Sequence, residues 1–138
     1  MFEVEVKQVP AQRYSSRTAN LHVHELPPFI GETIGELAAA GMDGPPFAIY
    51  HGQVNETDDG PVEVGVPQAG GDKELPAGEV AFTAVAGDDC AFPQILGAYD
   101  AIVRWAQENS REFAGSPREV YLSGPDEPQS WEVVWPLR

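Results

Sequence analysis

Apolar residues recur at helical spacing in two segments of the chain. In residues 29–41 they fall on one face of a helix, and the run from Ile95 to Ala106 has the same periodicity. The first set is Ile30, Ile34, Leu37 and Ala38, and the second is Ile95, Tyr99, Ile102, Val103 and Ala106. Gly41 and Asn109 are suitable residues to end these helices. The pattern therefore predicts two amphipathic helices.

Four short segments alternate apolar and other residues with the period of two that is typical of β-strands. They are 47–50, 62–66, 118–122 and 131–135. One face of these strands is apolar, carries Trp131 and Trp135, and is expected to pack against the helices. The other face mixes acids, tyrosines and small residues: Ala48, Tyr50, Glu63, Gly65, Glu119, Tyr121, Glu132 and Val134. We expect Tyr50, Glu63, Glu119, Tyr121 and Glu132 to line one cavity.

The chain also repeats itself. The paired segments, in the same order, are VPAQR 9–13 with LPAGE 75–79, GPPFAIYHG 44–52 with GSPREVYLSG 115–124, and VEVGVP 62–67 with WEVVWP 131–136. Each copy gives a strand, a Pro-Ala turn, a strand, a helix and two strands. The sequence therefore predicts one domain over 1–138, built from a first half at 1–69 and a second half at 72–138.

Composition narrows the classes of function. The 138 residues carry a net charge of −14 and one cysteine, Cys90. That charge argues against binding nucleic-acid phosphates or an anionic membrane, and a single cysteine excludes an internal disulfide. The N-terminus lacks the pattern of a signal peptide, so a cytoplasmic location is expected. No phosphate-binding glycine loop, serine elbow or zinc motif occurs, so we expect no cofactor and no metal.

The repeated motifs, in this order, resemble those of the GyrI-like small-molecule-binding family, which includes the effector-binding domains of multidrug-sensing transcription activators. The resemblance covers about residues 2–138. It implies an α+β fold of two βαββ-type halves with antiparallel sheets, related by a pseudo-twofold axis. It also implies a central ligand cleft for aromatic, often cationic, small molecules.

Within this resemblance, the family's cation-facing Glu in the penultimate strand maps onto Glu119, and its last-strand acid maps onto Glu132. Some stand-alone members hydrolyse cyclopropanoid compounds with an acid and aromatic neighbours, which here implies Glu119, Glu132 and Tyr121 as candidate catalytic residues. Many members have an aromatic residue two positions after the last-strand acid, where this chain has Val134. The departure removes one wall of the expected aromatic cage.

The acidic candidate residues each allow two interpretations. Glu119 beside Tyr121 is either a groove carboxylate, which the repeat favours, or a surface residue. Glu63 and Glu132 are repeat-related, and they are either two solvated acids or a close pair in which repulsion raises one pKa. The predicted ligand-binding residues are Ala48, Tyr50, Glu63, Glu119, Tyr121, Glu132 and Val134.

Two other features are weaker candidates for a functional site. His22 and His24 have metal-ligand spacing but no evident third ligand, so we expect loop histidines rather than a metal site. Cys90 is flanked by aspartates, which raise a thiol pKa and disfavour nucleophilic chemistry.

The sequence thus predicts a stand-alone binding protein for aromatic or cationic xenobiotics. One alternative is a hydrolase that detoxifies reactive electrophiles in the same cleft. Another is a protein-interaction module, such as a gyrase inhibitor. Whether the chain is an enzyme stays open at this point.

Overall fold

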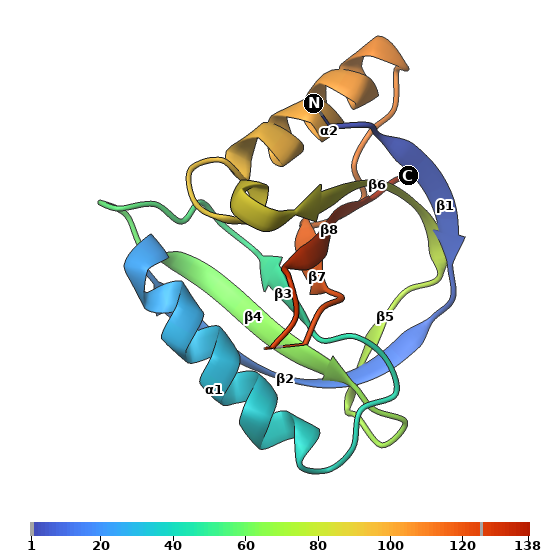
Figure 1. Cartoon of the computed structure of the whole chain (residues 1–138). Helices are drawn as coiled ribbons and strands as arrows, with labels where there is room; N and C mark the ends of the chain where they lie inside the picture. Colours follow the sequence, from blue (N-terminus) through green and yellow to red (C-terminus); the bar gives the residue numbers. More distant parts are fainter. Residues whose placement is uncertain (1, 125) are drawn as a thin grey trace. The chain divides into compact units, whose positions relative to one another are not determined.

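The computed structural model describes residues 2–124 and 126–138. Over these residues the elements run β1–β2–α1–β3–β4 and then β5–β6–α2–β7–β8 (Figure 1). The order of strand, strand, helix, strand and strand thus occurs twice, as the repeated motifs predict. The strands pair antiparallel, and the fold class is α+β, as expected.

The elements of the first repeat are β1 Glu5–Val9, β2 Gln12–Leu21, α1 Leu26–Ala38, β3 Phe47–Tyr50 and β4 Gly60–Pro67. The elements of the second repeat are β5 Lys73–Leu75, β6 Gly78–Ala86, α2 Leu96–Glu108, β7 Arg118–Tyr121 and β8 Ser130–Pro136. A short 3-10 turn precedes each helix, η1 at Val23–Glu25 and η2 at Gly87–Cys90.

Two compact units divide the chain. Unit 1 contains the N-terminal segment up to Pro10 together with Ala77–Arg138, and unit 2 contains Ala11–Pro76. The strand order is β1-β6-β8-β7 in unit 1 and β3-β4-β2-β5 in unit 2. The first strand of each repeat therefore pairs with the second strand of the other repeat, β1 with β6 and β5 with β2. Both Pro-Ala dipeptides stand at the points where the chain passes from one unit to the other. The superposition of 1–69 on 72–138 stays a prediction.

The helices lie close to the predicted segments, with ends set by local residues. Helix α1 starts three residues before the predicted segment, with proline in its first positions, where proline's missing N–H is harmless. It ends at Ala38, and Gly41 follows in the left-handed region at φ 103°. Asn109 caps the end of α2, as expected, with its backbone N–H donating to Trp105.

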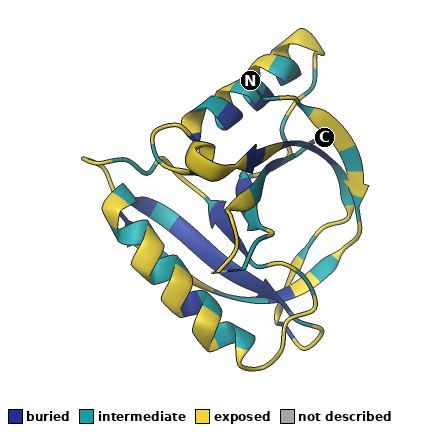
Figure 2. Cartoon of the chain, viewed as in Figure 1, coloured by how far each residue is buried: buried dark blue, intermediate teal, exposed yellow. Residues whose placement is uncertain are grey.

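Each unit buries an apolar layer of its own (Figure 2). In unit 1, Ala98 and Ile102 of α2 belong to a cluster with Ala81, Val85 and Val133 of the strands. Trp131 and Trp135 pack against this cluster, which confirms that they face a helix. In unit 2, β4 is buried along almost all of its length, and Val62, Val64 and Val66 have no exposed surface.

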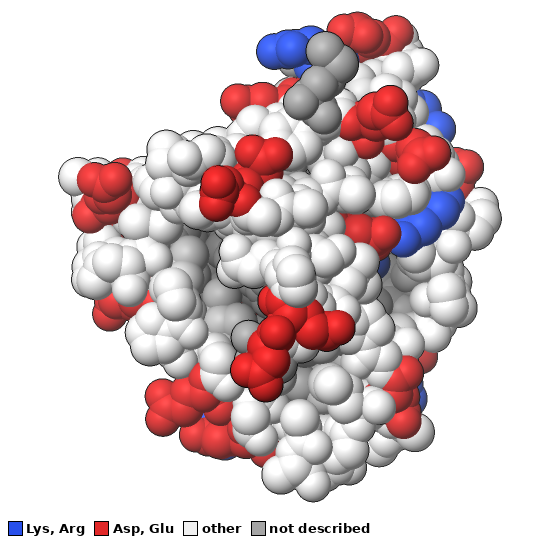
Figure 3. All heavy atoms as spheres, in the orientation of Figure 1, with Lys and Arg blue, Asp and Glu red and all other residues white. Residues whose placement is uncertain are grey.

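Acidic side chains far outnumber Lys and Arg on the face seen in Figure 3, in keeping with the net charge of −14. Among the described residues, no helix is long and apolar enough to cross a membrane.

Candidate functional site

Strand register decides which side chains of unit 1 share a face. Glu119 lies directly opposite Val133, and Tyr121 lies opposite Trp131. Directly paired residues point to the same face of a sheet, so Glu119 and Tyr121 lie on the face that packs against α2. Glu132 alternates with Trp131 and Val133 and points to the other face. The expectation that Glu119 and Glu132 share a face is therefore wrong.

The same correction applies in unit 2. Ile49 lies opposite Glu63, and Tyr50 lies opposite Val62. Tyr50 and Ala48 therefore share the face of Val62, whereas Glu63 is on the opposite face, and the expected grouping of all three is wrong. Alternation fixes the faces within one strand, but a shift of one residue between strands exchanges the faces that meet.

Glu119 is the acid on the helix-covered face of unit 1. Its side chain accepts a hydrogen bond from the Tyr99 hydroxyl at 2.7 Å and one from the Tyr121 hydroxyl at 3.1 Å. The residue is 6% exposed, although it is an acid on a short strand. The Tyr121 ring meets the Trp131 ring edge-on at 4.8 Å between centroids, and Tyr99 contacts Trp135 in the same way at 6.3 Å. The carboxylate thus lies among aromatic rings.

Two further polar groups lie on this face. Cys90 is a buried free thiol in the same cluster as Val133. Burial raises the pKa of the Cys90 thiol, and the nearby charges of Glu119 and Asp89 raise it further, which agrees with the expectation that this thiol is no nucleophile. Thr83 of β6 lies opposite Val133 and is 1% exposed.

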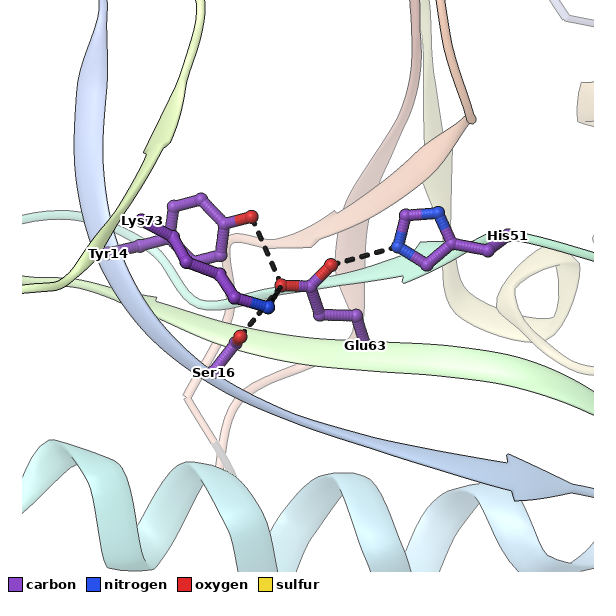
Figure 4. Close-up of polar contacts among 5 residues, drawn as sticks. All are labelled: Tyr14, Ser16, His51, Glu63 and Lys73. Carbon is purple, nitrogen blue, oxygen red and sulfur yellow. Dashed lines mark hydrogen bonds and ion pairs between the residues drawn. The ribbon is translucent and has the colours of Figure 1, made fainter.

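A second buried acid, Glu63, is the centre of a polar cluster in unit 2 (Figure 4). One carboxylate oxygen accepts hydrogen bonds from Ser16 at 2.7 Å, Lys73 at 2.9 Å and Tyr14 at 3.1 Å. The other oxygen lies 2.8 Å from Nε2 of His51. Figure 4 places this cluster on the side of β4 away from helix α1.

The cluster keeps Glu63 charged. Burial raises the pKa of Glu63, but its hydrogen bonds with His51, Ser16, Lys73 and Tyr14 outweigh burial and lower the pKa from 4.5 to about 2. The protein's own donors thus surround this carboxylate. This arrangement suits a structural charge better than a group that receives a ligand.

Glu132 is the repeat counterpart of Glu63. It accepts one hydrogen bond, from Lys7 at 2.9 Å, and the Lys7 ammonium lies 4.1 Å from the centroid of the Phe82 ring. Val134 is buried on the same face of β8 as Glu132. Glu132 and Val134 therefore lie on the face of unit 1 opposite Glu119.

The predicted histidine pair forms no metal site with other side chains. His22 and His24 stack at 5.7 Å between ring centroids, and Nδ1 of His22 lies 3.1 Å from Glu25. Within residues 2–124 and 126–138, no group of three or more His, Cys, Asp or Glu side chains is placed to hold a metal ion.

The partners of the acids are not evident from the sequence. The spacing places Tyr99 on the apolar face of a helix and does not indicate that its hydroxyl contacts Glu119. Lys73 and Lys7 each pair with a repeat-related glutamate, so aligning β1 with β5 would have indicated them. Thr83 carries no sequence signal, because a threonine within an apolar strand is ordinary.

No protein-family model and no curated protein sequence matches the chain. Solved structures do match. The chain aligns with the crystal structure of the EcmrR C-terminal domain at a TM-score of 0.76 and 20% identity, over 100% of this chain and 98% of that chain. In the cryo-EM structure of an EcmrR–DNA complex, it covers 57% of the matched chain.

Two more distant structures share the fold. A hydrolase from Listeria innocua aligns at a TM-score of 0.67 and 12% identity, over 99% of this chain and 92% of that chain. SAV2435 bound to tetraphenylphosphonium aligns at a TM-score of 0.63 and 11% identity, over 99% and 94%. The chain therefore has the GyrI-like fold that its motifs resemble, and at these identities the likeness is one of fold.

Proposed function

We propose that this protein binds small aromatic cations, with Glu119 as the residue that recognises the positive charge. The observation that carries the proposal is a carboxylate only 6% exposed, on the helix-covered face of unit 1, between two tyrosine hydroxyls. A buried carboxylate is costly, and a cation that binds beside it offsets that cost.

The surroundings of Glu119 suit an aromatic ligand. The rings of Tyr99, Tyr121, Trp131 and Trp135 lie around this face. An aromatic face attracts a cation by about 0.5–2 kcal/mol, depending on how far it is desolvated. The net charge of −14 also raises the local concentration of cations around the protein.

One structural neighbour supports this choice of ligand. SAV2435, which shares the fold, is described as bound to tetraphenylphosphonium, an aromatic cation. The finer ligand-binding roles predicted for Ala48, Tyr50, Glu63, Glu132 and Val134 stay predictions. The register of β7 and β8 removes the geometric reason for grouping Glu132 and Val134 with Glu119.

Calorimetric titration with tetraphenylphosphonium and with neutral triphenylphosphine oxide tests the proposal. Glu119→Gln keeps the shape of the side chain and removes its charge. For the cation we expect a loss of about 2–5 kcal/mol of binding free energy, as when one partner of a buried charge pair is removed. The neutral compound should lose much less.

Glu79→Gln is the matched control, because Glu79 is an acid of the same unit that pairs with Arg111 at the surface. It removes the same overall charge at a different place and should leave cation affinity nearly unchanged. Equal losses in the two variants would mean that the net charge, and not Glu119, attracts the cation.

A hydrolase is the second candidate function. Glu119 with a tyrosine hydroxyl at 2.7 Å has the parts of an acid–base pair, and a Listeria innocua protein of this fold is described as a hydrolase. Turnover of a cyclopropanoid electrophile that Glu119→Gln abolishes would support this function over binding alone. A protein partner such as gyrase stays a prediction.

A further inference from the structure

One buried hydroxyl in unit 1 has no partner. Thr83 Oγ1 is buried and makes no hydrogen bond, and no other side-chain polar atom of the described residues is in this state. A buried hydroxyl without a partner destabilises a protein, and valine would fill the same space without that cost. Buried polar groups without a hydrogen-bond partner are rare in native proteins, so this one requires an explanation.

Thr83 stands in one row with the acid of the proposed site. Thr83 lies opposite Val133 on one side of β8, and Glu119 lies opposite Val133 on the other side. The three residues therefore cross β6, β8 and β7 on the face that packs against α2. Two strand spacings separate the backbones of Thr83 and Glu119 by about 10 Å.

The corresponding row of unit 2 has none of this chemistry. Val64 is the repeat counterpart of Val133, and it is flanked by Arg17 and Ala48. Arg17 is exposed and bonds Glu36 of α1, and Ala48 is apolar. The buried hydroxyl and the buried acid of the row therefore occur in unit 1 and have no counterpart in the row of unit 2.

We propose that Thr83 is a specificity-determining residue of the Glu119 site, whose hydroxyl bonds a polar group of the ligand. This inference rests on the proposed function. The ligand class is an aromatic cation with an amine, hydroxyl or carbonyl group about 10 Å from the part that contacts Glu119, a length set by the strand spacing. Val133, which stands between them, belongs to the apolar cluster of unit 1, so the middle of the row is apolar. A threonine hydroxyl both donates and accepts, so either kind of polar group is suitable.

Two matched phenanthridinium cations test the inference. Ethidium carries amine groups at the two ends of its ring system, and N-ethyl-6-phenylphenanthridinium is the same cation without them. Both are titrated into the wild type, Thr83→Val, Thr83→Ser and Glu119→Gln, and the melting temperature of each variant is recorded. Thr83→Val removes the hydroxyl at nearly constant shape, and Thr83→Ser keeps it.

We expect Thr83→Val to weaken ethidium about tenfold, the size of one net hydrogen bond, and to leave the amine-free cation within about twofold. Thr83→Ser should keep the preference for ethidium. The melting temperature of unliganded Thr83→Val should stay level or rise, because the orphan hydroxyl is gone.

Thr83→Val without effect on either cation, or with equal losses for both, would overturn the inference and leave Thr83 as a packing residue. Glu119→Gln reports on the proposed function separately, because it should weaken both cations. If Glu119→Gln weakens both and Thr83→Val changes neither, the inference alone fails. If Glu119→Gln changes neither, or the wild type binds neither, the proposed function fails together with the inference.

Discussion

The Glu63 cluster of unit 2 and the Glu132 pair of unit 1 occupy the same position of the sequence repeat and have the same lysine partner. Lys73 donates to Glu63 at 2.9 Å, and Lys7 donates to Glu132 at 2.9 Å. The register confirms the equivalence, because Lys73 lies opposite Tyr14 and Lys7 lies opposite Val80.

The two acids differ in their other neighbours. Glu63 also has the hydroxyls of Tyr14 and Ser16, whose counterparts near Glu132 are the apolar side chains of Val80 and Phe82. Glu63 is almost fully buried and Glu132 is only partly buried. A carboxylate that loses its water needs several donors in place of it, and one lysine is insufficient. Both copies of the repeat thus contain the lysine–glutamate ion pair. The neighbouring side chains, which differ between the copies, determine how deeply each glutamate is buried.

The largest expected difference between the two acids is in stability. Glu63→Gln should lower the free energy of unfolding by about 3 kcal/mol, because it leaves Lys73 without its counter-charge and His51 without its carboxylate partner. This is the low end for a buried pair, since both partners are about half exposed and reach water. Urea denaturation at neutral pH measures the effect. A loss as small as that of Glu132→Gln would contradict the comparison.

The pH dependence should follow the same acid. The pKa of Glu63 is lowered to about 2 in the folded protein, so the unfolded chain binds the proton more readily. Its stabilisation is therefore complete above about pH 4.5 and is lost as the pH falls towards about 2, with a total of about 3 kcal/mol. Denaturation of the wild type and Glu63→Gln across this window measures it. Parallel curves for the two proteins would show that another group is responsible.

Gly65, two residues after Glu63 on β4, leaves room for two aromatic rings. A Cβ at Gly65 would lie 2.6 Å from the Phe47 ring and 3.0 Å from the Tyr14 ring, whereas the counterpart in unit 1 is Val134. Gly65→Ala should cost about 1–3 kcal/mol, because the two rings would have to move. Thermal unfolding measures this. A variant as stable as the wild type would show that the aromatic pair is loosely held.

The smallest effect is expected at Glu132. Its pair with Lys7 is partly exposed, so Glu132→Gln should change stability by about 0–1 kcal/mol. The change should shrink further in high salt, which screens such pairs. Thermal unfolding at low and high ionic strength measures it, and a loss near that of Glu63→Gln would show that the ion pair alone supports both acids.

Much of the fold was predictable from local patterns. The spacing of Ile95, Ile102 and Ala106 predicted α2 and its buried face, because these residues are one or two helical turns apart. The repeated motifs predicted the order of elements twice. The pairing of β1 with β6 and of β5 with β2 was not predictable, because each of these strands pairs with a strand of the other repeat. A strand of five residues, such as β1, or of three, such as β5, is too short to specify that partner.

The sequence by itself determined the two helices, the repeated order of strands and the acids at Glu63, Glu119 and Glu132. It also determined that Trp131 and Trp135 face a helix. Only the tertiary structure decided that Glu119 shares their face and that Glu132 does not. The physical reason is that side-chain alternation is a property of one strand, whereas a shared face depends on hydrogen-bond register between strands, and a shift of one residue reverses it.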